Sequence, residues 1–139
     1  MPDPSQNVRT DRIDPERKLI MDTKELGIFG EEHAALYLKD LGYQIIARNY
    51  RSRYGEIDII AQKDDTIVFI EVKARRSYLY GEPKDSIHIR KQKKLIQTAM
   101  IFLQEKGWEE HDCRFDVIEV TFLPNGSIKP YHIENAFSE

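Results

Sequence analysis

Four charged residues, Glu56, Asp58, Glu71 and Lys73, have the types and spacing that could carry out chemistry. They lie in two β-rich runs separated by a short acidic turn, so we expect an antiparallel hairpin. In that hairpin Asp58 faces Glu71 and Glu56 faces Lys73, and all four share one face because strand side chains alternate. Two carboxylates about 5 Å apart repel by about 3 kcal/mol at an effective dielectric of 20. A cation must offset this repulsion, which favours Mg²⁺ or Mn²⁺.

The register of this hairpin follows from its turn. If Asp64 and Asp65 form a two-residue turn, residues 56–62 pair with residues 67–73, and the numbers of opposed residues add up to 129. The second face is then wholly apolar, and it consists of Ile57, Ile59, Ala61, Val68, Ile70 and Val72. Charged side chains gathered at one end of the first face therefore need a functional or structural reason.

Glu31 is a further candidate ligand, because it falls on the apolar stripe of a helix expected over residues 24–41. An acidic residue on a core-facing stripe is costly unless it is paired or binds a metal. The other interpretation is structural. In that interpretation Glu56 neutralises Lys73, Asp58 caps a turn or pairs with an arginine, and Glu31 is a boundary residue.

The chain has 139 residues and a net charge of −3, but its charges are unevenly distributed. Residues 73–94 carry eight Lys or Arg against two acidic residues, and residues 48–53 add three Arg. An acidic protein with such segments is expected to bind a polyanion on one face. The candidate nucleic-acid-binding residues are Arg51, Arg53, Arg75, Arg76, Arg90, Lys91 and Lys94. The alternative is a solvated lysine-rich helix face.

The elements that must position these residues alternate between helical and β patterns. Helices are expected over residues 24–41 and from 87 to about 107, and strands over residues 43–50, 56–62, 66–74, 114–123 and 127–133. A loop is expected over residues 75–86. This order favours the α/β class, as a three-layer α/β/α sandwich with a mixed central sheet. We expect residues 1–21 to be a flexible extension with nothing to bury, and residues 22–139 to form a single domain.

Several classes of protein are excluded by composition. No apolar run approaches the roughly 20 residues of a membrane span, and no secretory signal pattern opens the sequence. The lone Cys113 fits a reducing compartment, so a cytoplasmic protein is expected. His111 and Cys113 lack a third group to orient them as a nucleophile pair, and Asp116 is expected to be an internal ion-pair partner.

A resemblance to known families adds to this interpretation. Asp58, followed after twelve residues by Glu71-Val72-Lys73, resembles the signature of PD-(D/E)xK nucleases, although Ile57 stands where the Pro would be. The chain also resembles the bacterial YraN family, itself similar to archaeal Holliday-junction resolvases, over roughly residues 23–122. The motifs that carry this resemblance are Gly27-x-x-Gly30-Glu31-x-x-Ala34, Arg48-Asn49, Gly55-Glu56-Ile57-Asp58, Phe69 to Arg75, Gly81, Lys91 and Arg114-Phe115-Asp116.

The resemblance implies a restriction-endonuclease-like fold and metal-dependent hydrolysis of phosphodiester bonds in DNA, with structured or branched DNA as the expected target. Asp58 and Glu71 would hold Mg²⁺ or Mn²⁺, with Glu31 assisting directly or through water. Lys73 would orient or activate the attacking water. Glu56 would bind a second metal ion or restrain Lys73. A resolvase-like reaction would also require a homodimer.

Two other classes of function fit the same sequence. One is a nucleic-acid-binding module without catalysis that keeps a metal site for structural reasons. The other is an interaction protein that docks an acidic partner on its basic helix. The intact set of Asp58, Glu71 and Lys73 favours the enzyme over both.

Overall fold

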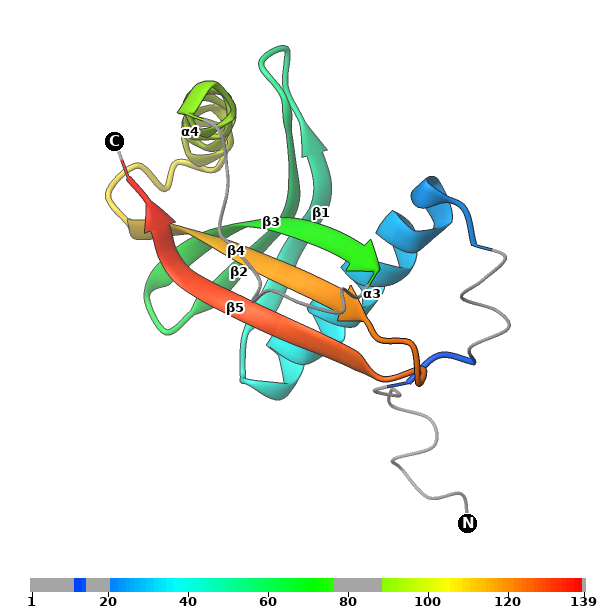
Figure 1. Ribbon diagram of the computed structural model, residues 1–139. Coiled ribbons are helices and arrows are strands. Elements are labelled where there is room, and N and C mark those ends of the chain that lie inside the picture. Colours follow the sequence, from blue (N-terminus) through cyan, green and yellow to red (C-terminus); the bar gives the residue numbers. More distant parts are fainter. Residues whose placement is uncertain (1–11, 15–20, 77–88, 139) are drawn as a thin grey trace.

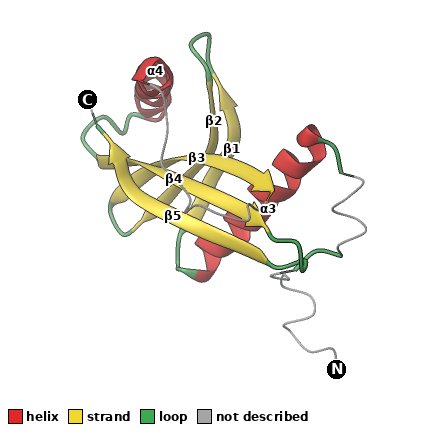
Figure 2. Ribbon diagram, in the orientation of Figure 1, coloured by secondary structure: helices red, strands yellow, loops and turns green. Residues whose placement is uncertain are grey.

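The computed structural model describes residues 12–14, 21–76 and 89–138. In chain order the elements are α3 (Thr23–Asp40), β1 (Gln44–Arg51), β2 (Glu56–Lys63), β3 (Thr66–Arg76), α4 (Ile89–Lys106), β4 (Asp112–Phe122) and β5 (Ile128–Phe137). The strands form one sheet in the order β1-β2-β3-β4-β5. Strands β3 and β4 are parallel and the other neighbours are antiparallel, so the sheet is mixed (Figures 1 and 2). The predicted α/β class and mixed sheet are confirmed.

The predicted order of elements is also confirmed, with small differences at their ends. Strand β5 extends to Phe137, four residues beyond its predicted end. The predicted start of the second helix at residue 87, and residues 77–86 of the predicted loop with Gly81, lie outside the described residues. Neither described helix has the length and apolar character needed to cross a membrane.

The core consists of two clusters, and each helix packs on a different one. Helix α3 contributes Leu26, Ala34, Ala35 and Leu38 to the first cluster, whereas α4 contributes Leu95, Ala99, Phe102 and Leu103 to the second. Strand β3 serves both clusters, because Val68 and Ile70 face α3 while Ile67 and Phe69 face α4. A strand that is apolar on both faces is typical of a sheet covered on both sides.

The first helix is fixed locally at both ends. At its start Asp22 Oδ1 accepts a hydrogen bond from the Glu25 backbone N–H (2.7 Å), and Glu25 Oε1 accepts one from the Asp22 N–H (3.3 Å). These two bonds form a capping box. Beyond its end Gly42 has a φ of 90°, which fits the predicted glycine cap.

The expectation that residues 1–21 bury nothing is wrong for two residues. Ile13 and Met21 are 6% and 3% exposed and belong to the cluster under α3. The Ile13 N–H donates to the Gly126 carbonyl at 2.6 Å, and Arg76 donates to the Met21 carbonyl. The domain boundary at residue 22 stays a prediction, but side chains before it complete the core.

We therefore expect Ile13→Ala to lower the free energy of unfolding by about 2 kcal/mol, since a buried aliphatic side chain is lost. Ile28→Ala is the matched control, because Ile28 on α3 is 56% exposed. Its stability should stay within about 0.5 kcal/mol of the wild type. Chemical denaturation of the three proteins measures the difference. Equal stability of the Ile13 variant and the wild type would show that this segment does not pack on the domain.

Candidate active site

The hairpin formed by β2 and β3 has the predicted register only over part of its length. The pairs run from Lys63–Thr66 to Ile59–Ile70, joined by the turn at residues 64 and 65. The ladder stops there, and the next backbone N–H, that of Val72, donates to Asp58 Oδ2 at 2.8 Å. The prediction that Asp58 opposes Glu71 as a strand pair is therefore wrong, as is the corresponding pair of Glu56 and Lys73, because the Asp58 side chain takes the place of a ladder partner.

The irregular strand geometry at Asp58 extends into the neighbouring strand β1. Asn49 stands across from Asp58 between the pairs Arg48–Ile59 and Tyr50–Ile57, and its φ of 53° is in the left-handed region. Residues before and after this position, which a regular strand would place on one face of the sheet, lie on opposite faces. Ile59 lies in the cluster under α3, whereas Ile57 and Tyr50 pack in the cluster under α4. The predicted apolar face that included Ile57 is thus corrected, and Figure 1 shows β1 and β2 diverging from β3 toward their connecting turn.

The left-handed backbone of Asn49 leads to a prediction. Asn49→Gly should retain the backbone shape, since glycine adopts a positive φ without strain. Asn49→Ala loses the same side-chain hydrogen bonds but should be less stable than the glycine variant by about 1 kcal/mol, because of its Cβ. Urea denaturation of the two variants measures this difference. If the alanine variant were the more stable, the kink at this position would not require a left-handed residue.

Asp58 carries a half-buried carboxyl group with a perturbed pKa. Burial raises the pKa of Asp58 to about 7, and the nearby charge of Glu71 adds to this effect. The Val72 N–H opposes the rise in the pKa because it stabilises the carboxylate. A carboxyl group that exchanges its proton near neutral pH beside a second carboxyl group is typical of functional sites.

Glu71 is 8% exposed, and Lys91 from α4 reaches it. Lys91 Nζ lies 2.5 Å from Glu71 Oε1, so a cation from a different element already balances this carboxylate. Burial raises the pKa of Glu71, while Lys91 and then Lys73 act in the opposite direction. The sequence pointed to Lys91 as a phosphate contact and as one of the family motifs, but its bond to Glu71 depends on how α4 packs on the sheet.

Glu31 approaches the site from α3, next to a close helix–strand contact. A Cβ added to Gly30 would lie 2.6 Å from Ala74 Cβ on β3, so only glycine lets the helix come this near. Glu31 accepts a hydrogen bond from Asn49 Nδ2 at 3.0 Å, and its charge raises the pKa of Asp58 and of Glu71. The predicted grouping of Glu31 with these two carboxylates is consistent with this electrostatic coupling.

Glu56 lies beside the same asparagine. It forms an ion pair with Arg51 Nε at 2.5 Å and accepts a longer hydrogen bond from Asn49 at 3.5 Å. Asn49 therefore joins Glu31 to Glu56, a role that the sequence did not reveal. The available signal was a residue type that tolerates a left-handed backbone in the middle of a strand.

The predicted nucleic-acid-binding residues fall into three groups, and one of them, Arg51 and Arg53, is exposed near the turn between β1 and β2. Arg90, Lys91 and Lys94 lie together along the first half of α4. Arg75 instead forms an ion pair at 3.1 Å with Glu119, which is 1% exposed, and Arg76 binds the Met21 carbonyl. The structure thus leaves exposed basic charge on α4 and near the turn between β1 and β2, and it uses the arginines of β3 partly for internal contacts.

The described residues offer two carboxylates, but no larger ligand set, to a small hard cation such as Mg²⁺. Across the described ranges, no three His, Cys, Asp or Glu side chains are arranged to hold a metal ion together. Mg²⁺ nevertheless needs only one or two carboxylates when water and phosphate supply the remaining oxygens. Asp58 and Glu71 satisfy that requirement, and the ammonium group of Lys91 already occupies a cation position beside Glu71.

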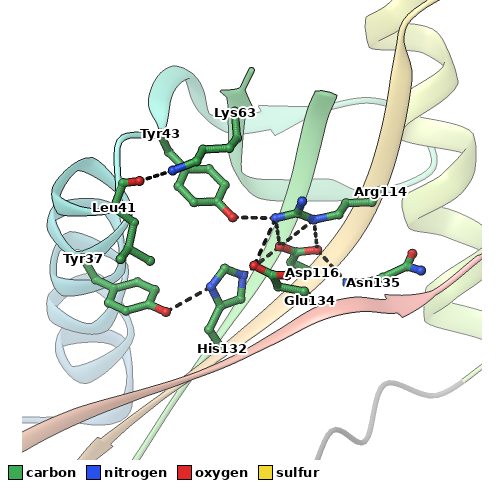
Figure 3. Close-up of polar contacts among 9 residues, drawn as sticks. All are labelled: Tyr37, Leu41, Tyr43, Lys63, Arg114, Asp116, His132, Glu134 and Asn135. Carbon is green, nitrogen blue, oxygen red and sulfur yellow. Dashed lines mark hydrogen bonds and ion pairs between the residues drawn. The ribbon is translucent and has the colours of Figure 1, made fainter. Parts of the chain in front are cut away.

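Asp116 lies at the centre of a separate buried network (Figure 3). It is fully buried and contacts Arg114 (3.0 Å), His132 Nε2 (2.7 Å) and the Asn135 N–H (2.9 Å). Burial alone would raise the pKa of Asp116, but the hydrogen bonds of His132 and Arg114 lower it overall. Tyr37 on α3 hydrogen-bonds to His132. The prediction of an internal ion-pair partner is confirmed.

Comparison with known proteins assigns this chain to a protein family. The model of a family described as an uncharacterised protein family, UPF0102, matches residues 30–120. The chain belongs to the UPF0102 family. This finding confirms the resemblance to YraN proteins, which form the same family.

Relatives within UPF0102 match over most of their length. A UPF0102 protein of Sulfurihydrogenibium sp. is 44% identical over 85% of this chain and 98% of its own length. One from Symbiobacterium thermophilum is 45% identical over 83% and 98% of the two chains, respectively. Among solved structures, Pyrococcus furiosus SfsA in complex with Ca²⁺ is similar with a TM-score of 0.40 and 20% identity. That match covers 83% of this chain and 64% of SfsA, so this chain spans less than two thirds of the SfsA length.

Proposed function

We propose that this protein hydrolyses phosphodiester bonds of DNA in a reaction that depends on Mg²⁺ or Mn²⁺, at the Asp58–Glu71 pair. The observation that carries the proposal is the pair itself. The buried Glu71 raises the pKa of the half-buried Asp58, and two lysines, Lys73 on β3 and Lys91 on α4, lower the pKa of Glu71. A fold that only needed to be stable would gain by replacing such a pair with apolar residues. The proposal includes the three-layer, restriction-endonuclease-like arrangement around this sheet.

Each residue has a role in this proposal. Asp58 and Glu71 would hold the metal ion, with Glu31 assisting through water and Glu56 completing a second site or restraining Lys73. Lys73 would orient the attacking water and stabilise charge on the phosphoryl oxygens. A bound Mg²⁺ or Mn²⁺ supplies Lewis acidity toward the phosphoryl oxygen and lowers the pKa of a bound water.

The basic residues on α4 would hold the DNA backbone. Phosphate contacts position a duplex and give affinity without selecting a sequence. Branched DNA fits this mode of binding, and a homodimer would be needed to cut two strands of a junction. A cytoplasmic location is part of the same proposal.

A non-catalytic nucleic-acid-binding module is the second candidate, and one observation favours it. Lys91 forms an ion pair with Glu71, and the Val72 N–H donates a hydrogen bond to one oxygen of Asp58. Both carboxyl groups therefore have partners without a metal ion. A binding module that keeps the pair for structural reasons would show this arrangement as well.

A cleavage assay separates the two candidates. Wild-type protein is incubated with linear duplex, flapped, single-stranded and four-way DNA, each with Mn²⁺ and with EDTA. We expect Mn²⁺-dependent products from at least one substrate. DNA binding without cleavage across the whole panel would reject the enzyme and leave the binding module.

A further inference from the structure

A pocket of about 410 Å³ lies between the turn that joins β1 to β2 and the first half of α4. Its lining includes Tyr54, Gly55, Glu56, Arg90, Lys91, Lys94 and Leu95. This volume falls within the roughly 300–1,000 Å³ that is common for small-molecule sites. The pocket adjoins the carboxylate pair without containing it, so it is a separate place where part of a substrate could bind.

The wall formed by the turn is firmly attached to α4. Ser52 Oγ lies 2.8 Å from Thr98 Oγ1, and Thr98 is fully buried. Ser52 Oγ also accepts a hydrogen bond from the Tyr54 N–H at 3.0 Å, and the Ser52 N–H donates to the Gly55 carbonyl at 2.8 Å. A Cβ added to Gly55 would meet Lys94 Cβ at 3.7 Å, so the turn and the helix are in contact. The pocket is thus preorganised.

The lining favours a ligand that carries both negative charge and an aromatic ring. Arg90, Lys91 and Lys94 bring three cations, whereas the single carboxylate, Glu56, is already paired with Arg51. Phosphate oxygens are natural partners for such a cluster.

Tyr54 supplies the aromatic surface. The Arg53 guanidinium lies 4.9 Å from the centre of the Tyr54 ring and donates to its hydroxyl group at 2.8 Å. A ring steadied on one side by a guanidinium is suited to stack a nucleobase on its other side. A base is available for stacking only when it has left the base stack of a duplex.

Lys91 connects this pocket to the carboxylate pair. It lines the pocket and also lies 2.5 Å from Glu71 Oε1. A phosphate group in the pocket could therefore contact the same lysine that contacts Glu71 at the proposed cleavage site. The nucleotide in the pocket would be next to the phosphate that is cut.

We propose that this pocket binds one unstacked nucleotide of single-stranded DNA, with Tyr54 stacking on the base and Arg90 and Lys94 contacting its phosphates. The inference rests on the proposed function, because it makes the preferred substrate class DNA with single-stranded nucleotides at the cut, such as a flap or an opened junction. Continuous duplex DNA would bind the basic surface without filling the pocket.

The test measures binding in EDTA, so it does not depend on cleavage. Fluorescence anisotropy with a labelled six-nucleotide oligothymidylate compares wild type with Tyr54→Leu, Tyr54→Phe and Tyr131→Leu. Loss of the ring should weaken binding about tenfold, as is usual for one stacked base. Tyr54→Phe keeps the ring, and Tyr131 is an exposed tyrosine on β5, so both of these variants should bind within about twofold of wild type. Lys94→Gln, which leaves the ring in place, should also weaken binding.

A second probe isolates the base. On an oligonucleotide of the same length without bases, wild type and Tyr54→Leu should bind equally. Equal binding of oligothymidylate by wild type, Tyr54→Leu and Lys94→Gln would overturn the pocket assignment, even if the protein cuts DNA. The expected pattern in a protein that cuts no DNA would uphold the pocket and reject the proposed function, so the two failures are distinguishable.

Discussion

Glu71→Gln is expected to reduce Mn²⁺-dependent DNA cleavage by about a thousandfold or more, which corresponds to about 4 kcal/mol of lost transition-state stabilisation. The amide keeps the size of the side chain but gives up the charge that a divalent cation needs. Asp58→Asn removes the second charged ligand and should have a similar effect. Lys73→Met should reduce cleavage by about a hundredfold or more, as is typical for loss of a group that stabilises developing charge.

Binding of DNA should survive these changes, because the proposed phosphate contacts Arg90, Lys91 and Lys94 lie on α4 rather than on the hairpin. Matched controls are Glu110→Gln and Lys129→Met, which alter exposed residues of the same types. Initial rates and dissociation constants are measured on the substrate that wild type cuts best. Cleavage at the wild-type rate by all three site variants would mean that the activity arises elsewhere or from a contaminant.

Asp58→Asn is expected to raise the stability of the metal-free protein by about 2 kcal/mol above pH 7, because it removes a charge that burial and Glu71 disfavour. The amide oxygen still accepts the Val72 N–H, so the backbone contact is retained. The pKa of Asp58 is about 7 in the folded state, above the value of about 3.9 for an unperturbed Asp.

The sign of the pH dependence follows from these two values. Between about pH 4 and pH 7 the folded wild type holds a proton on Asp58 that the unfolded chain releases. The wild type therefore loses stability from this group as the pH rises through that window, and the asparagine variant does not. The gain from the substitution should be small at pH 4 and complete above pH 7.

Guanidinium denaturation in EDTA at several pH values measures this gain, with Asp112→Asn as a control at an exposed aspartate. An Asp58→Asn protein that is less stable than wild type at pH 7.5 would show that the carboxylate is a stabilising partner, as in the structural interpretation of the hairpin.

The hairpin shows what the sequence could and could not predict. Its turn and its register from Ile59–Ile70 to Lys63–Thr66 follow from local patterning, because the strand period and a two-residue turn leave one solution. The pattern could not show that the ladder ends at Asp58. That break arises from a left-handed residue on the neighbouring strand and from a side chain that replaces a backbone acceptor.

Other differences have a tertiary origin as well. Lys91 was visible as one of several basic residues, but its contact with Glu71 joins two elements whose relative placement depends on the packing of α4. Ile13 lies in a short segment without periodicity, so its burial could not be deduced from spacing. Tyr54 gave no signal in the sequence, because its significance depends on the pocket beside it.

The central claim is that Asp58 and Glu71 form a site for a divalent cation. It is tested most directly by the melting temperatures of wild type and Asp58→Asn, each in EDTA and in Mn²⁺. At a hundredfold excess over the dissociation constant, Mn²⁺ should stabilise wild type by about 2.7 kcal/mol and leave the variant nearly unchanged. A wild type that melts at the same temperature with and without millimolar Mn²⁺, beside a variant that is less stable than wild type, would contradict the account.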